Sequence, residues 1–173
     1  VEIGVDYLRK VKEEPQNVYV GKNVIVVGGG DVAMDVARTA KLRGADNVNI
    51  LYRRTENEMP AYIDEKVETK EAGVNIYVKF KPVSIEGNSK VEKATFESLG
   101  NDTNITMKCD QYILAISQES EENVDELLDS SKGIFAAGDV VSSEKTVVYA
   151  IKSGKEVAKR AIDFVNEKSS VKC

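Results

Sequence analysis

The chain has 173 residues, enough to bury the core of one sizeable domain or of two small ones. Hydrophobic residues make up 42% and charged residues 31% of it, the proportions of an ordinary soluble protein. The formal net charge of −5 argues against a nucleic acid or an anionic membrane as a partner, and no apolar run is long enough to span a bilayer.

The side chains that usually carry metal and acid–base chemistry are scarce. There is no histidine, and Cys109 and Cys173 are too far apart for a CxxC redox pair. Zinc chemistry and Ser–His catalysis therefore lack ligands and a base, and we expect neither a metal site nor a catalytic side chain. This use of cysteine favours a reduced, cytoplasmic location. Because the first residue is Val1 rather than methionine, we expect the chain to be a piece of a longer protein.

The first twenty residues predict a short amphipathic helix. Val5, Leu8 and Val11 recur among charged residues at helical spacing, and the helix must end before Pro15. We expect residues 1–20 to form a helical linker segment that leads into the first strand.

The next stretch organises the rest of the chain. The β-branched run Val24–Val27 predicts a strand buried on both faces, as in a parallel sheet. Three glycines follow, and a helical pattern over Asp31–Leu42 then ends at Arg43 and Gly44. A strand, a glycine turn and a helix in this order are the context in which G-x-G-x-x-A predicts dinucleotide binding.

Each small residue of this motif has a physical role. Gly28 permits the tight turn, Gly30 lets a pyrophosphate approach the backbone, and Ala33 lets the helix pack close to the strand. The free N–H groups and the positive dipole end of the helix would face the phosphates. The alternative is a glycine turn in an α/β domain that binds no nucleotide.

The second strand decides which dinucleotide is expected. Asn47–Tyr52 predicts this strand, and Arg53 and Arg54 follow it, where an NAD-binding protein has an acidic residue for the ribose 2′-OH. A guanidinium can bind a 2′-phosphate with two parallel hydrogen bonds, whereas a carboxylate would repel it. These residues therefore favour NADP over NAD. The alternative is that both arginines are solvated loop charges.

The remaining elements complete an α/β pattern. A helix is expected over Ala61–Ala72 with Tyr62, Ile63 and Val67 facing inward, and Val74–Phe80 predicts a third parallel strand. Short runs separated by Gly- and Asn-containing turns then predict an antiparallel meander. The meander and the later elements are Lys81–Glu86, Lys90–Glu97 and Thr103–Cys109, a strand over Asp110–Ile116, a loop or weak helix over 117–131, a strand over Gly133–Asp139, and a helix over Thr146–Lys168.

This order predicts an α/β fold, a Rossmann-like three-layer domain with a central parallel sheet and an antiparallel β-meander insertion. Five motifs then carry a resemblance that covers nearly the whole chain: Val26–Arg38, Tyr52–Arg54, Glu58–Ala61, Ala115–Gln118 and Gly133–Asp139. Together they resemble the small subunits of NADPH-dependent glutamate synthases and the matching part of dihydropyrimidine dehydrogenases. Both belong to the pyridine nucleotide-disulfide oxidoreductase superfamily of flavoproteins.

The resemblance implies a function. In that family NADPH delivers hydride to FAD, and electrons continue to iron–sulfur centres or to a partner such as the glutamate synthase large subunit. It implies an NADPH-binding domain over residues 21–132, with the meander at about 81–109, and a C-terminal strand and helix of the FAD-binding region over 133–173. The implied cofactor contacts are Gly28, Gly30, Asp31, Val32 and Ala33 for the pyrophosphate, Arg53 and Arg54 for the 2′-phosphate, Ser117 and Gln118 near NADPH, and Gly138, Asp139 and Thr146 toward FAD.

The chain also departs from the family. The N-terminal FAD half with the iron–sulfur cysteines is not in this sequence, so we expect FAD to bind weakly or not at all and the isolated chain to be inactive. Ser117 stands where the family usually has glycine, and the segment between Gln118 and Gly133 is short. Without the surrounding motif, Asp139 would be interpreted as a turn cap.

Two other functions are considered. One is a non-catalytic nucleotide-binding or interaction module. The other is a short-chain dehydrogenase, since Tyr62 and Lys66 have its Tyr-x-x-x-Lys spacing. That pair follows the second strand directly, too early for such an enzyme, so an exposed Tyr–Lys pair on a helix is the better interpretation.

Overall fold

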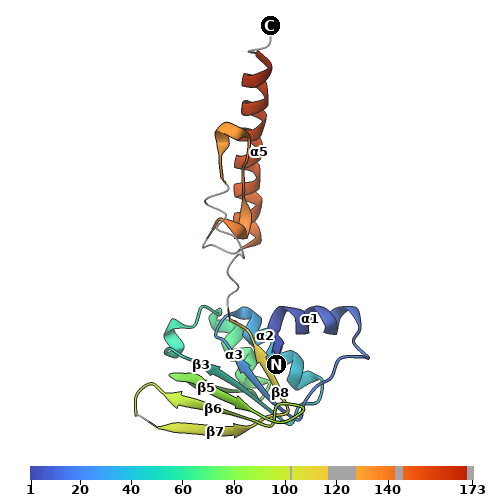
Figure 1. The fold of residues 1–173 in the computed structure, drawn as a ribbon, viewed down its shortest axis with the longest axis vertical. Coiled ribbons are helices and arrows are strands. Elements are labelled where there is room, and N and C mark those ends of the chain that lie inside the picture. The colour runs from blue at the N-terminus through green and yellow to red at the C-terminus, as the bar shows by residue number, and fades with distance from the viewer. Residues whose placement is uncertain (102, 117–127, 143–145, 171–173) are drawn as a thin grey trace. The chain divides into compact units, whose positions relative to one another are not determined.

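The computed structural model describes residues 1–101, 103–116, 128–142 and 146–170. Ser117 and Gln118, both expected near the nucleotide, lie outside these described residues. The chain divides into two compact units, residues 1–117 and 118–173, which are taken in turn below (Figure 1).

The first unit is built on a five-stranded parallel sheet. Val27 in the central strand pairs with Leu51 on one side and Leu114 on the other, so the carboxyl ends of the strands meet at one edge. In spatial order the strands are β1 (Glu2–Ile3), β8 (Gln111–Leu114), β2 (Asn23–Val27), β3 (Asn47–Tyr52) and β4 (Asn75–Val78).

Helices cover one face of this sheet (Figure 1). They are α1 (Gly4–Glu13), α2 (Asp31–Leu42) and α3 (Ile63–Glu71), with a single 3₁₀ turn, η1 (Glu56–Glu58), between β3 and α3. Alternate residues of β2 pack against fully buried residues of α2, among them Met34 and Val36. The α2 bounds are those predicted from the hydrophobic periodicity.

The N-terminal segment belongs to this unit. We expected residues 1–20 to be a linker, but Tyr7 of α1 is fully buried in the helix-side core and β1 pairs with β8. The helix itself was predicted, and its packing was not. Tyr7 faces the sheet together with Leu8 and Val11, so α1 contributes a three-residue apolar face to the core.

An antiparallel sheet covers the other face of the parallel sheet. It consists of β5 (Phe80–Glu86), β6 (Lys93–Ser98) and β7 (Asn104–Lys108), in that order. Phe96 of β6 stacks on Tyr112 of β8 with ring centroids 6.4 Å apart, inside a second buried cluster that includes Ile25 and Leu51. The predicted three-layer α/β fold with an antiparallel meander is confirmed.

The prediction of the inward face of α3 was wrong. Ile63 is 73% exposed, and Tyr62 and Val67 are exposed as well. Thr69 is the residue that α3 buries, and its hydroxyl donates a hydrogen bond to the Glu65 carbonyl at 2.7 Å. The helix packs by charge because Arg38 of α2 reaches Glu65 and Glu68 and thereby turns the acidic side of α3 toward α2.

The predicted strand Val74–Phe80 is divided between two sheets. The strand β4 ends at Val78, and Lys79 follows with φ at 61°. That left-handed conformation breaks the extended backbone, so that Phe80 begins β5 in the antiparallel sheet. One residue therefore moves the chain from one layer to the next.

The second unit consists of η2 (Ser130–Lys132), η3 (Gly138–Val140) and α5 (Val147–Ser170). The predicted helix is confirmed to within two residues. The predicted strand Gly133–Asp139 is wrong, since residues 134–137 have no regular structure and η3 follows them. Among the described residues of this unit no strand lies beside that segment, and a strand needs a neighbour to satisfy its backbone hydrogen bonds.

Candidate functional site

The candidate site lies at the carboxyl edge of the parallel sheet. The chain leaves β2 at the glycine turn and enters α2, and the segment after β3 begins with the two arginines. In open α/β sheets ligands bind at this edge because loops and helix N-termini converge there. The predicted nucleotide contacts that the structure describes in the first unit are all brought to it.

Only glycine fits at residue 28. Its φ is +154°, and its N–H donates a hydrogen bond to the Leu51 carbonyl at 3.1 Å. A Cβ at this position would lie 2.2 Å from the backbone oxygen of Ala115, the residue that follows β8. The strand on one side therefore fixes the turn through a hydrogen bond, and the strand on the other side leaves no room for a side chain.

The other two glycines differ in what surrounds them. A Cβ on Gly29 would lie 2.5 Å from the Tyr52 ring, whereas a Cβ on Gly30 would have Pro60 as its nearest neighbour, at 3.8 Å. Gly30 is the N-cap of α2 and provides no capping side chain. A side chain on Gly30 would thus have no neighbour closer than Pro60, and this room at the start of α2 fits a bound pyrophosphate.

The first residues of α2 pack against the core and hold the start of α3. Ala33 is fully buried, and Val32 packs partly against the core. The Asp31 carboxylate accepts a hydrogen bond from the Tyr62 N–H at 3.1 Å, and the Gly29 carbonyl accepts one from the Ala61 N–H at 3.1 Å. These two bonds fasten the start of α3 to the glycine turn.

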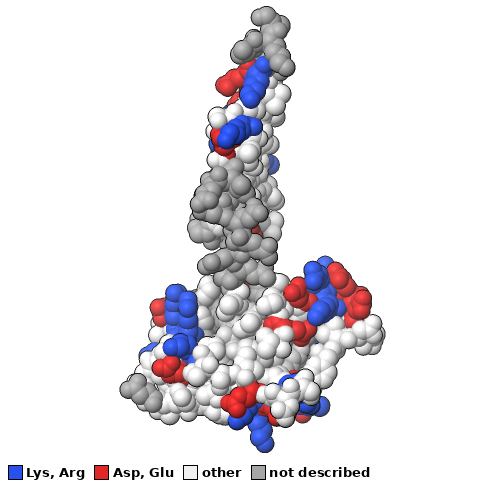
Figure 2. Space-filling model, viewed as in Figure 1, with Lys and Arg blue, Asp and Glu red and all other residues white. Residues whose placement is uncertain are grey.

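Arg53 and Arg54 follow β3, and both are exposed. Their guanidinium groups have no ion pair with any of the residues that the structure describes. Figure 2 shows basic side chains gathered over the side of this unit on which η1 lies. Two exposed cations next to an uncapped helix N-terminus suit a ligand with two separate anionic groups.

Glu58 is an acidic residue close to these cations, but its carboxylate is hydrogen-bonded to Thr55 and not to either arginine. Its carboxylate accepts hydrogen bonds from the Thr55 hydroxyl at 2.6 Å and from the Thr55 N–H at 3.0 Å. These bonds lower the pKa of Glu58, and the charges of Arg54 and Lys79 lower it further. Glu58 therefore holds the loop in a capping box and remains ionised.

The second unit contains the other predicted contacts. Gly138 has φ at 78°, and its N–H donates to the Ser153 hydroxyl at 3.0 Å. Asp139 is exposed in η3. The Thr146 hydroxyl accepts a hydrogen bond from the Tyr149 N–H at 3.2 Å and so caps the start of α5.

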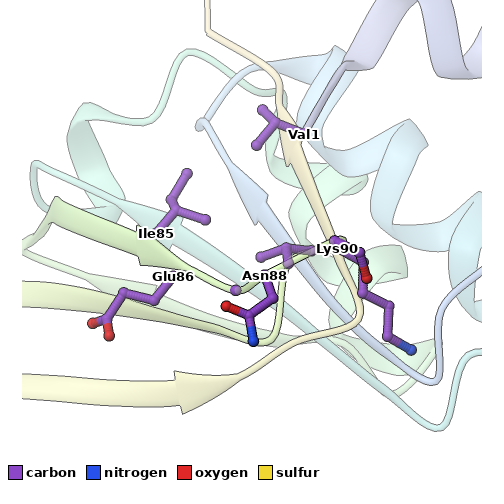
Figure 3. A pocket seen from close by; sticks show the side chains of 8 residues that line it. Val1, Ile85, Glu86, Asn88 and Lys90 are labelled. Atoms are coloured by element: carbon purple, nitrogen blue, oxygen red, sulfur yellow. The ribbon is translucent and has the colours of Figure 1, made fainter.

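Other features of the described residues do not compete with this site. They contain no group of three or more side chains able to hold a metal, and none of their helices is long and apolar enough to cross a membrane. Lys66 donates to the Glu56 carbonyl at 3.3 Å, a loop contact. A cavity of about 290 Å³ at the β5–β6 turn is lined by Val1 and residues 85–91, none of which belongs to the glycine turn (Figure 3).

Sequence reasoning missed three residues that shape the site. Gly29 could have been noticed as the middle of three glycines, and Tyr52, which restricts it, as the last residue of the second strand. Ala115 lies in a sequence motif, but no local pattern gives it this role, because its effect on Gly28 depends on the pairing of β8 with β2, in which Val27 lies opposite Leu114.

Comparisons with known proteins show the family of this chain. The family model described as pyridine nucleotide-disulphide oxidoreductase matches residues 4–154. The chain belongs to this family. The match includes the glycine turn, both arginines and η3, and it confirms the family expected from the sequence motifs.

Two relatives illustrate the similarity in sequence. The chain is 37% identical over 171 residues to the NAD-dependent dihydropyrimidine dehydrogenase subunit PreT of Escherichia coli K12, covering 91% of this chain and 40% of that one. It is 31% identical over 173 residues to the glutamate synthase [NADPH] small chain of Azospirillum brasilense, covering 80% and 36%. The chain thus spans about two fifths of the length of these relatives.

A crystal structure of Lactococcus lactis thioredoxin reductase superposes with a TM-score of 0.75 at 20% identity. It covers 96% of this chain and 62% of the reductase. At this identity the likeness shows a shared fold.

Proposed function

We propose that this chain is the NADPH-binding part of a flavoprotein oxidoreductase that passes hydride from NADPH to FAD. The observation that carries the proposal is a glycine turn at an uncapped helix N-terminus, on the same sheet edge as two arginines that form no ion pair with another described residue. NADPH has two anionic groups, a pyrophosphate and a ribose 2′-phosphate, and this edge offers a binding group for each.

Each residue of the glycine turn has a separate role in the proposed binding of the pyrophosphate. The Ala33 N–H already donates to the Gly30 carbonyl at 2.9 Å, so the N–H groups that precede it at the start of α2 are the ones that can donate to the pyrophosphate, aided by the helix dipole. Gly30 keeps the space before them clear, and Gly28 holds the turn between β3 and β8. Asp31 holds the start of α3 through Tyr62, so its role is to position the loop.

NADPH itself supplies the hydride when it is bound. The protein has to hold the nucleotide in one orientation and needs no acid or base for this step. Arg53 and Arg54 would anchor the adenosine end, and Ser117 and Gln118 are proposed as further contacts of the nucleotide.

The choice of NADPH rests on the arginines. The relatives differ in the nucleotide that their names give, NAD for the E. coli subunit and NADPH for the Azospirillum chain. No carboxylate follows β3 directly, and Glu58 is bonded to Thr55. A free 2′-OH would therefore gain no acidic acceptor here, whereas a 2′-phosphate would gain two guanidinium groups.

FAD and an electron-accepting partner complete the proposal. We infer a nucleotide domain over residues 21–132 and an FAD-contacting region over 133–173, with Gly138, Asp139 and Thr146 near the flavin nucleotide in the longer protein. The named relatives are subunits of larger oxidoreductases, which favours a partner subunit, either a glutamate-synthase-type large subunit or an iron–sulfur protein.

Nucleotide binding by the chain tests the proposal. The parent is expected to bind NADPH roughly tenfold or more tighter than NADH, measured by nucleotide fluorescence, since a phosphate held by charge-assisted hydrogen bonds is worth more than 1 kcal/mol. Arg53→Ala combined with Arg54→Ala is expected to weaken this preference strongly, because both guanidinium groups are lost. Lys12→Ala with Lys108→Ala removes the same charge from exposed positions of α1 and β7 and serves as the control. A parent without preference, or a double arginine variant that keeps it, contradicts the proposal.

A further inference from the structure

The residue that follows β4 has an unusual backbone. Lys79 has φ at 61°, and within the described residues it is the one non-glycine residue with positive φ. Lysine gains nothing from this conformation, which glycine adopts at no steric cost. A strained residue of this kind at a ligand-binding edge is a reason to look for a functional role.

Two backbone hydrogen bonds hold Lys79 in place. Its N–H donates to the Arg54 carbonyl at 3.0 Å, and its carbonyl accepts from the Leu99 N–H at 2.8 Å. The first bond continues the pairing of β3 with β4, in which Tyr52 lies opposite Val78. Lys79 is therefore fixed directly beside the arginine segment.

The Lys79 ammonium group is available to a ligand. The side chain is exposed and has no ion pair with another described residue. Its charge and that of Arg54 both act on Glu58, whose carboxylate is already bonded to Thr55. Three cations thus lie at the ends of two adjacent strands, and the acid beside them is engaged in a capping box.

We propose that Lys79 is a third cationic contact for the phosphate on the ribose, and that it helps this chain to choose a 2′-phosphorylated nucleotide. This inference rests on the proposed function, since it concerns the same end of the ligand. It adds a residue from a different strand, which no spacing rule after the glycine turn would identify. An ammonium group supplies a compact charge with three donors, which complements the planar arginine groups.

The experiment compares two small ligands that differ in the 2′-phosphate alone. Dissociation constants for adenosine 2′,5′-bisphosphate and for 5′-AMP are measured calorimetrically on the parent chain, Lys79→Met and Lys79→Gly. Both variants are expected to bind the bisphosphate about 3- to 5-fold more weakly, the upper part of the range for one exposed charge pair. Their affinity for 5′-AMP is expected to stay within about twofold of the parent's, because the pyrophosphate turn is unchanged.

Lys79→Gly also separates binding from folding. Glycine suits the positive φ, so this variant is expected to keep or raise the melting temperature, by roughly 1–3 °C, while it loses affinity. Lys81→Met, which removes a neighbouring lysine paired with Glu97 at 3.0 Å, is the control and should leave both dissociation constants unchanged.

The outcomes are distinct. Bisphosphate affinity at the parent level in both Lys79 variants, or an equal loss for the two ligands, overturns the role of Lys79. If the arginine variants still lose the preference for NADPH in that case, the proposed function stands. A parent chain that binds the bisphosphate no more tightly than 5′-AMP overturns both proposals.

Discussion

The backbone oxygen of Ala115 lies where a side chain on Gly28 would begin, 2.2 Å from the position of a Cβ. Ala115 directly follows β8 and Gly28 directly follows β2, so two paired strands far apart in sequence jointly require glycine at the head of the turn. The sheet thereby fixes the turn that would hold a pyrophosphate.

This contact predicts that Gly28→Ala is severely destabilising. The added methyl must displace the β8 backbone at a φ that L-residues rarely adopt, at a cost of about 3 kcal/mol or more. Urea unfolding followed by circular dichroism measures it. Gly100→Ala, where a Cβ meets nothing within 4 Å, is the control and should change the unfolding free energy little. A Gly28→Ala protein as stable as the control would contradict this view of the turn.

Gly30→Ala is predicted to separate binding from stability. A Cβ there has its nearest protein neighbour at 3.8 Å, and the backbone has ordinary extended angles, so the loss of stability should be no more than about 1 kcal/mol, as for alanine at an N-cap. The methyl would occupy the space before the first turn of α2 and weaken NADPH and NADH binding alike. Nucleotide titration and urea unfolding of the same preparation check both parts. Unchanged affinity would place the pyrophosphate elsewhere.

Arg38 is predicted to fasten α3 to α2. Its guanidinium, with the side chain 19% exposed, reaches Asp35 at 2.8 Å, Glu68 at 3.0 Å, and Glu65. Burial lowers the pKa of Arg38, but the hydrogen bonds to Glu65 and Asp35 outweigh this effect and raise it, so the group stays charged.

Replacing Arg38 by methionine removes the partner of Glu65, which is partly buried, and of Glu68, which is exposed, and we expect a loss of about 1–2 kcal/mol. The control is Arg9→Met, which breaks an exposed pair with Asp6 on α1 and should cost less than about 0.5 kcal/mol. Equal unfolding free energies for the two variants would show that the α2–α3 contact does not depend on charge.

Asp110 is predicted to make stability depend on pH in the acid range. Its carboxylate accepts hydrogen bonds from the Asn23 N–H at 2.8 Å and from the Asn23 side chain at 3.1 Å. The bond from the Asn23 N–H lowers its pKa below the ordinary 3.8, although partial burial opposes this effect. A depressed pKa in the folded state stabilises above the unfolded value, and this contribution is lost as the pH falls below about 3.8.

The comparison is between the parent and Asp110→Ala. At pH 7 the variant should be less stable by about 1 kcal/mol, and the difference should shrink between pH 4 and pH 3 as the parent's carboxylate is protonated. Urea unfolding at several pH values measures it, with Glu13→Ala, at an exposed position of α1, as the control. If the difference in unfolding free energy stays constant down to pH 3, the negative charge of Asp110 is not its source.

Local pattern was enough for the centre of the fold. The strand β2, the glycine turn and α2 follow from a β-branched run, three glycines and a helical period, and the meander follows from its short runs and turns. These features were predictable because each element's own residues decide its conformation and its buried face. The family follows from the same motifs.

Other features depend on partners that no local window contains. The acidic side of α3 faces α2 because Arg38 lies there. The segment 133–139 is not a strand because no described strand of its unit pairs with it. The left-handed backbone of Lys79 interrupts the chain after β4, where a continuous strand was expected.

The sequence by itself therefore determined the α/β class, the glycine turn and the arginine pair, since backbone propensity and residue chemistry act locally. Only the tertiary structure decided that Ala115 closes the turn, that Asp31 and Arg38 hold α3, and that Lys79 stands beside Arg54. Each of these contacts joins segments that lie apart in the sequence and side by side in the fold. The stability that each residue contributes therefore depends on the residue that it contacts and cannot be predicted from its own segment alone.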